Sequence, residues 1–181
     1  MNLVFHQRVD LVGDALAPAS DLAALDPAGY ARAMAKYDDT PERQRLRGTE
    51  IPGLARTWTE VVFLSPVHPH AIWWAWREIR GKELPCAEFW AIPVDDLPAG
   101  TVVLNRTVTA TGDPIDASEV APFHPASFVT ATEAPAANRA WLEEMVRRGV
   151  SGAWFHGTPH LLAPGAVPLG NAQVIGWEEP I

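Results

Sequence analysis

The stretch Thr57-Trp-Thr-Glu-Val-Val-Phe-Leu-Ser-Pro-Val-His-Pro-His70 decides which class of fold this chain adopts. Its first part, residues 57–64, is rich in β-branched and aromatic side chains, which favours a strand. The strand is expected to end at Ser65-Pro66, because proline has no backbone N–H to give to a sheet. A helix is expected from Pro69 to Arg80, where apolar side chains recur on one face before a glycine.

The remaining elements are short, because 17 prolines interrupt the chain. Further strands are expected at residues 2–6, 88–94, 101–105, 152–157, 160–163 and 172–177. Further helices are expected at 20–37 with a break at Asp26-Pro27, at 40–48 and at 138–148, and a long loop at 111–135. Strands and helices do not alternate regularly, and no glycine-rich phosphate loop follows a strand. The order predicts a single α+β domain over residues 1–181 rather than a Rossmann or P-loop fold.

Composition excludes several classes of protein. The single cysteine, Cys86, rules out a disulfide framework and a cysteine-based zinc site. No apolar run is long enough to span a membrane, and the N-terminal residues do not form a signal peptide, so no membrane partner and a cytoplasmic location are expected. The formal net charge of -8 argues against a nucleic-acid partner, because phosphate neutralisation dominates such binding.

The six histidines are the main candidates for chemistry, since imidazole is the natural acid or base at neutral pH. His6 ends the first expected strand, His68 follows the strongest strand, and His160 begins a late one. The alternative reading of each is structural, with His6 an ordinary strand end and His68 a helix cap.

Histidine pairs also suggest a metal site, with His-x-His spacing at His68 and His70 and a four-residue spacing at His156 and His160. Prolines interrupt both pairs, so neither regular strand geometry nor a helical pair of ligands is available. We therefore expect no metal. His70 and His156 stay as candidate contacts to a substrate.

Two other clusters leave alternatives open. Arg43, Arg45 and Arg47 form either a solvated helical face or a site for an anionic group such as a pyrophosphate. Trp73 and Trp74 are consecutive on a helix and point about 100° apart. At least one of them is therefore expected to leave the core for a pocket or an interface.

Three segments, in order, resemble the ADP-ribosyltransferase fold, in particular its DNA-targeting toxin branch, the DarT-like proteins. Val4-Phe5-His6-Gln7-Arg8 is similar to a first strand that ends in a histidine motif. Residues 62–70 are similar to a strand that runs through a Ser-Pro segment into a helix. Residues 159–169 are similar to the closing strands of that branch, with His160 at the position of the family's catalytic glutamate.

The resemblance implies a split mixed or antiparallel sheet with flanking helices and a cleft that binds NAD. His6, with Gln7 and Arg8, would face the adenosine ribose, Ser65 the nicotinamide ribose, and Arg45 with its neighbours the pyrophosphate. His160, His6 and His68 are the candidate catalytic residues, since a histidine in place of the glutamate can donate a hydrogen bond or act as a base. His70, Trp73 and His156 are the candidate substrate contacts.

Three functions are compatible with these patterns. The first is an ADP-ribosyltransferase-like enzyme that uses NAD on a small-molecule or protein acceptor. The second is an NAD-independent cyclase, isomerase or lyase with histidine acid–base catalysis in a tryptophan-rich pocket. The third is a non-catalytic binding or immunity module, which predicts a shallow surface with the histidines far apart.

Overall fold

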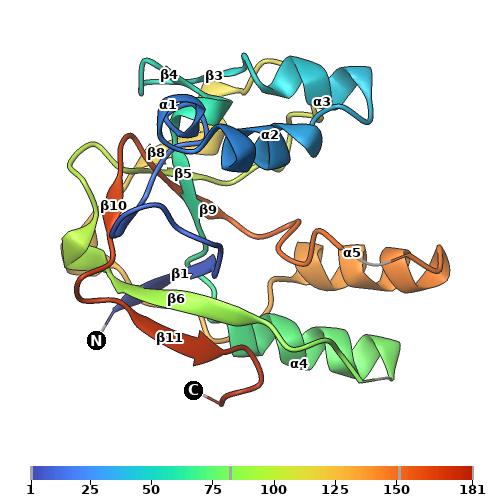
Figure 1. Ribbon diagram of the computed structural model, residues 1–181. Helices are drawn as coiled ribbons and strands as arrows, with labels where there is room; N and C mark the ends of the chain where they lie inside the picture. The colour runs from blue at the N-terminus through green and yellow to red at the C-terminus, as the bar shows by residue number, and fades with distance from the viewer. Residues whose placement is uncertain (1, 82, 151, 181) are drawn as a thin grey trace.

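The computed structural model describes residues 2–81, 83–150 and 152–180, and its framework is two antiparallel sheets with helices around them (Figure 1). The first sheet has the strand order β1 (Leu3–Gln7), β6 (Glu88–Pro93), β11 (Gln173–Gly176). The second has the order β5 (Val62–Leu64), β9 (His160–Ala163), β7 (Val102–Leu104), β8 (Val120–Pro122). The expectation of an α+β fold is confirmed.

The two sheets meet where β1 passes β5. Phe5 and Ser65 exchange backbone hydrogen bonds of 2.9 and 2.7 Å, and this bridge is the hydrogen-bonded link between the sheets that the structure describes. Either side of the bridge, β1 pairs with β6 and β5 pairs with β9. The sheets therefore share one seam and separate beyond it.

Alternation along β1 divides the core into two layers, because successive strand residues point to opposite faces. Val4 packs between the two sheets, with Ile92 from β6 and Leu64 and Leu161 from β5 and β9. Phe5 packs on the other face of the first sheet, against helices. A third cluster covers the outer face of the second sheet, around Leu104, Leu162 and Phe63.

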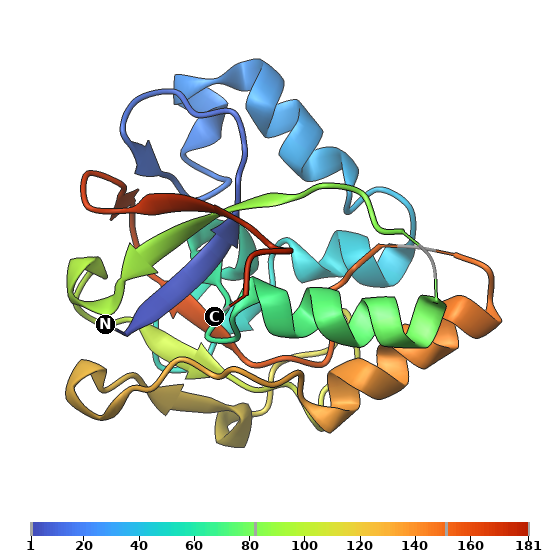
Figure 2. The ribbon, with the colours of Figure 1, turned by 90° about the horizontal axis from the view of Figure 1, so that it is seen from below.

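Two groups of helices lie at opposite ends of the molecule (Figures 1 and 2). The first group is α1 (Leu22–Leu25), α2 (Pro27–Ala35) and α3 (Pro41–Leu46). The second group is α4 (Pro69–Arg80) and α5 (Ala136–Arg147), which pack side by side and place their apolar side chains on one face of the first sheet. No helix in the described part of the chain is long and apolar enough to cross a membrane.

The helix boundaries follow from local chemistry. The break at Asp26-Pro27 is confirmed, since α1 ends and α2 begins there. In α3 the side chain of Thr40 accepts a hydrogen bond from the amide of Arg43 at 3.2 Å, as an N-cap does. The helix from Pro69 to Arg80 is confirmed too: His68 caps it, and Gly81 ends it in the left-handed conformation, at a φ of 64°.

The expected strand at 57–64 is interrupted. Arg56–Thr57 form β4, which pairs with β3 (Glu50–Ile51), and a 3-10 helix at Trp58–Glu60 follows. The cause is a capping box, in which the Glu60 carboxylate accepts hydrogen bonds from the Thr57 amide and hydroxyl at 2.7 and 2.8 Å. Residues 61–64 then return to extended conformation and lead into the seam.

The expected strand at 152–157 is wrong. Ala153 and Gly157 have left-handed backbone conformations, with φ of 46° and 76°, so the described part of this segment turns instead of pairing. The expected loop at 111–135 contains β8 and two 3-10 turns. Two further strands, β2 (Ala15–Leu16) and β10 (Val167–Pro168), pair with each other and were not expected.

A buried carboxylate organises the chain between β7 and β8. Glu119 is 5% exposed, and one of its oxygens accepts hydrogen bonds from three consecutive amides, at Thr107, Val108 and Thr109, of 2.6, 2.5 and 3.0 Å. Burial alone would raise the pKa of Glu119, but these amides and the Thr109 hydroxyl lower it to about 2. The carboxylate therefore stays ionised and holds this loop closed.

Candidate functional site

A cleft of about 1270 Å³ opens where the two sheets separate, and it is the candidate functional site. It is larger than the roughly 300–1000 Å³ of a typical small-molecule pocket, and so has room for a dinucleotide. Four parts of the fold line it: the end of β1 with the loop that follows, α2, the segment leading into β5, and the central strand β6 with the ends of β11 and the residues after it. The lining includes His6, Gln7, Arg8, Asp26, Gly29, Arg32, Ala33, Lys36, Tyr37, Trp58, Phe63, Cys86, Glu88, Trp90, Glu178 and Glu179.

The end of β1 forms one wall. His6 lies on the same face of the strand as Val4, but beyond the packed core, and its cross-strand neighbour in β6 is Trp90. Gln7 and Arg8 continue this wall, and the guanidinium of Arg8 lies 5.6 Å from the centre of the Trp90 ring. The structure therefore brings three of the residues expected to contact a cofactor into one cleft.

The imidazole of His6 is held in one tautomer. Its Nδ1 lies 2.6 Å from the Gln7 carbonyl oxygen, and because a carbonyl can only accept, Nδ1 carries the hydrogen. Burial lowers the pKa of His6, the Gln7 carbonyl partly offsets this, and the nearby Lys36 ammonium lowers the pKa further. At neutral pH the ring is thus uncharged, with a free lone pair on Nε2.

Helix α2 presents a stripe of small and cationic residues to the cleft. Gly29, Arg32, Ala33 and Lys36 recur at the i, i+3, i+4, i+7 spacing of one helix face, and all four line the cleft. At Gly29 the Asp26 carboxylate occupies the place where a Cβ would stand, while the long side chains of Arg32 and Lys36 carry positive charge. Arg32 makes only a long ion pair with Asp26, at 3.6 Å, and Lys36 makes none with the residues that the structure describes.

Aromatic rings form the wall opposite β1. The indole N–H of Trp58 donates to the Tyr37 hydroxyl at 3.1 Å, and the Trp58 ring lies 4.5 Å from the ring of Phe63. Lys36 stands over Tyr37, with its ammonium 5.0 Å from the ring centre. These rings offer flat apolar surface beside the cations of α2, which suits a ligand that has both aromatic and anionic parts.

The rim formed by β6 and β11 is acidic. Glu88 pairs with Arg8 at 2.6 Å, and Glu178 and Glu179 follow the end of β11. The exposed Cys86 lies on the same rim. Arg8 is paired on this rim, so the other cations of the cleft are Arg32, with Asp26 beside it, and Lys36 on α2.

His160 lies behind the aromatic wall rather than among the residues that line the cleft. It is opposite Leu104 in the second sheet, and its ring centre is 6.1 Å from that of Phe63. Burial, with the charges of His156 and Arg106, lowers its pKa to about 4, although a hydrogen bond with the Thr158 backbone raises it. His160 is consequently uncharged at neutral pH and separated from the cleft by Phe63.

His68, His70 and Trp73 lie on the other face of the first sheet from His6. The ring of His68 packs edge-on against Phe5 at 4.8 Å, and its Nδ1 accepts the His70 amide at the start of α4. His70 contacts the Trp177 carbonyl at 3.2 Å and stacks on Trp73 at 5.2 Å. Trp74 is 51% exposed, so one of the paired tryptophans does leave the core, for the surface of α4.

Ser65 and His156 have local partners. The buried Ser65 hydroxyl donates to the Val67 carbonyl and accepts from the Val67 amide, both at 3.0 Å, within the turn that leads to α4. The ring of His156 is 4.2 Å from that of Trp141 on α5. Neither side chain is among those that line the cleft.

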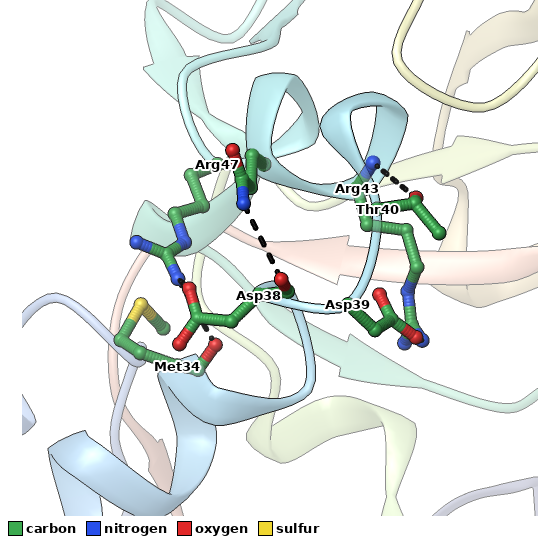
Figure 3. Close-up of polar contacts among 7 residues, drawn as sticks. Met34, Asp38, Asp39, Thr40, Arg43 and Arg47 are labelled. Carbon is green, nitrogen blue, oxygen red and sulfur yellow. Dashed lines mark hydrogen bonds and ion pairs between the residues drawn. The ribbon is translucent and has the colours of Figure 1, made fainter.

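The arginines at 43–47 lie outside the cleft. Arg43 pairs with Asp39 at 2.5 Å, and Arg47 pairs with Asp38 and also donates to the Met34 carbonyl (Figure 3). Arg45 donates to the Gly112 carbonyl at 3.3 Å. Two of the three charges thus stabilise the junction between α2 and α3, and the third contacts the loop before β8.

The sequence patterns did not single out Arg32, Lys36, Tyr37 and Trp90 as site residues. The helical spacing from Gly29 to Lys36 was available, because small and basic residues recur there on one face of the expected helix at 20–37. Trp90 had no such signal, since its place opposite His6 depends on the register between β1 and β6.

Comparisons with models of protein families, with curated protein sequences and with solved structures find no match to this chain. Within residues 2–81, 83–150 and 152–180, no group of three or more His, Cys, Asp or Glu side chains is placed to hold a metal ion.

Proposed function

We propose that the chain is an ADP-ribosyltransferase-like enzyme that binds NAD in the cleft beside His6 and acts on a small-molecule or protein acceptor. One observation carries this proposal. The segment His6-Gln7-Arg8, on which the family resemblance begins, lines a cleft of dinucleotide size together with the cations of α2.

The cleft offers a partner for each part of such a ligand. The free Nε2 of His6 accepts a hydrogen bond from a ribose hydroxyl. Arg32 and Lys36 supply the positive charge for a pyrophosphate, the part that the arginines at 43–47 were expected to contact. Trp58 and Trp90 provide flat surfaces for the rings.

NAD would supply the ADP-ribosyl group: the bond between ribose and nicotinamide breaks, a bond between ribose and the acceptor forms, and the acceptor's proton passes to a base. Among the candidates, His6 is the better base, because it lines the cleft and His160 does not; in that role its one Nε2 lone pair takes the acceptor's proton in place of the contact to a ribose hydroxyl. His160, with a pKa of about 4 and a place behind Phe63, fits a supporting role in which its neutral ring holds the aromatic wall.

The second candidate is an NAD-independent cyclase, isomerase or lyase. The observation that favours it is the same neutral His6 in a cleft walled by tryptophans, which suits acid–base chemistry on a ligand without phosphate. A non-catalytic module remains the third, and the separate surroundings of His6, His68 and His160 agree with it.

Calorimetric titration with NAD tests the proposal. We expect wild-type protein to bind NAD, and the double variant Arg32→Ala/Lys36→Ala to lose at least tenfold in affinity, because it removes two charge-assisted contacts. Arg148→Ala, an exposed arginine at the end of α5, is the matched control and should bind like wild type. A folded wild-type protein that does not bind NAD would rule the proposal out.

A further inference from the structure

Tyr37 is a buried phenol in the wall of the cleft. The residue is 6% exposed and lies two positions after the end of α2, with its amide bonded to the Met34 carbonyl at 2.8 Å. The chain has a second tyrosine, Tyr30, which lies on α2 but is not among the residues that line the cleft. The two tyrosines therefore form a natural pair of test and control.

The hydroxyl of Tyr37 has one hydrogen bond where it can make two. Its oxygen accepts the Trp58 indole N–H at 3.1 Å, which fixes the oxygen's position. Its own hydrogen reaches no acceptor among the residues that the structure describes. A hydroxyl in the wall of an open cleft can give its hydrogen to water or to a ligand that takes the place of that water. Because Tyr37 lines the cleft, the acceptor for this hydrogen is to be sought in a bound molecule.

The groups around Tyr37 indicate what kind of acceptor fits. The Lys36 ammonium lies 5.0 Å from the centre of the phenol ring and makes no ion pair with a described residue. Lys36 is also close enough to His6 to act on it electrostatically. The Tyr37 hydroxyl, the Lys36 ammonium and the imidazole of His6 are thus grouped at the α2 end of the cleft. They offer a hydrogen-bond donor, a cation and a lone pair.

We propose that the Tyr37 hydroxyl donates a hydrogen bond to a phosphate oxygen of the ligand, beside Lys36, while His6 accepts from a neighbouring sugar hydroxyl. The ligand class is therefore a phosphorylated sugar or nucleotide, recognised by a phosphate and a hydroxyl held next to each other. This inference deepens the proposed function and rests on the same cleft. Tyr37 acts as a binding residue, and Trp58 positions its oxygen.

The neighbouring cation explains why a phosphate fits better than a neutral acceptor. A hydrogen bond to a charged oxygen is about twice as strong as one between neutral groups, and Lys36 and Arg32 neutralise the charge that comes with it. A neutral carbonyl would leave the Lys36 ammonium without a counterion, whereas Arg32 has the Asp26 carboxylate at 3.6 Å. The rim with Glu178 and Glu179, by contrast, disfavours phosphate at the other end of the cleft.

Tyr37→Phe, which removes only the hydroxyl, tests the inference with Tyr30→Phe as control. Affinities for ADP-ribose, ribose 5-phosphate, inorganic pyrophosphate and adenosine are measured by calorimetry on both variants and on wild type. We expect Tyr37→Phe to weaken the three phosphorylated probes by about tenfold and to leave adenosine unchanged. Tyr30→Phe should match wild type with every probe.

Adenosine, which has no phosphate, distinguishes a lost phosphate contact from a general loosening of the cleft. If Tyr37→Phe had merely moved Trp58, the affinity for adenosine would fall together with the affinities for the other probes. Equal binding of the phosphorylated probes by Tyr37→Phe and wild type overturns the inference, as does an equal loss for adenosine. If ribose 5-phosphate and pyrophosphate bind through Tyr37 but NAD does not bind, the proposed function fails and the inference stands. If NAD binds Tyr37→Phe as tightly as it binds wild type, the inference about Tyr37 fails and the proposed function stands.

Discussion

Phe5 and Ser65 exchange backbone hydrogen bonds in both directions, at 2.9 and 2.7 Å, although 60 positions separate them in the chain. This pair joins the two sheets at the seam from which the cleft opens. The next residue after Phe5 is His6, which faces the cleft, and the next after Ser65 is Pro66, which leads to α4. The bridge thus sets where the cleft begins.

Ser65→Ala tests whether the serine hydroxyl serves the turn or a ligand. Its hydrogen bonds run to the amide and carbonyl of Val67, so we expect a loss of about 1 kcal/mol in the free energy of unfolding. Affinity for NAD should stay at the wild-type value, since the hydroxyl is not among the groups that line the cleft. Urea unfolding and calorimetric titration measure the two effects. A large loss of affinity with unchanged stability would return Ser65 to the role of cofactor contact.

Stability should fall as the pH drops from 6.5 to 4, because His160 is held neutral in the folded state. Its pKa is lowered from 6.5 to about 4, so in this window the unfolded chain binds a proton that the folded chain does not. This one group lowers the free energy of unfolding by about 3 kcal/mol, and the fall is complete below its folded pKa. His6 and His68 are shifted in the same direction and add to the decline.

In His160→Gln the free energy of unfolding should fall less between pH 6.5 and pH 4 than it does in wild type. Urea unfolding at several pH values measures it. His124→Gln is the matched control, because His124 is exposed in the segment after β8. A His160→Gln protein whose unfolding free energy still fell as steeply as that of wild type would show that the ring is not the group responsible.

Glu119→Gln should lower the free energy of unfolding at pH 7 by about 2 kcal/mol, because it removes the charge that three amides and the Thr109 hydroxyl stabilise. The folded pKa of Glu119 is lowered from 4.5 to about 2, so its contribution is present above pH 4.5 and disappears as the pH falls toward 2. The difference in unfolding free energy between wild type and Glu119→Gln should therefore become smaller as the pH falls from 4.5 toward 2. Glu133→Gln, at an exposed position, should behave like wild type.

Two glycines with the same kind of backbone separate conformational strain from steric overlap. Gly149 and Gly157 have φ of 67° and 76°, so alanine is strained at either position by roughly 1–2 kcal/mol. A Cβ at Gly149 meets nothing within 4 Å, whereas at Gly157 it would lie 2.8 Å from backbone atoms of Ala137 and Asn138 at the start of α5. Gly157→Ala should be the more destabilising by a further ~2 kcal/mol in thermal or urea unfolding. Equal losses would mean that α5 moves aside freely.

Local chemistry predicts some elements of this fold well and others poorly. The helix from Pro69 to Arg80 was predictable to the residue, because local signals mark both of its ends. His68 and Pro69 mark its start, and Gly81 marks its end. The strand expected at 57–64 was not, since the propensity of its β-branched residues is overridden by the Thr57–Glu60 capping box. The strand expected at 152–157 failed because two of its residues adopt left-handed conformations.

The site was predictable where it is local and not where it depends on pairing. His6, Gln7 and Arg8 are consecutive, so a pattern at one strand end locates all three. Trp90 reaches the cleft only through the antiparallel register of β1 and β6, and no spacing in the sequence reports that register. The arginines at 43–47 show the opposite error. Their density predicted a site for an anionic group, but Asp39 and Asp38 form ion pairs with Arg43 and Arg47.

The pairing of β1 also bears on how the chain reaches its folded state. Leu3 pairs with Pro93, and β6 must in turn wait for β11 near residue 176 before the first sheet is complete. During synthesis the apolar strand with Val4 and Phe5 emerges early and stays without its hydrogen-bonding partner until much of the chain has followed. Contacts that distant slow folding and leave an aggregation-prone segment exposed in the meantime. The strand β1 is therefore without its ladder until residues 89–93 have been made.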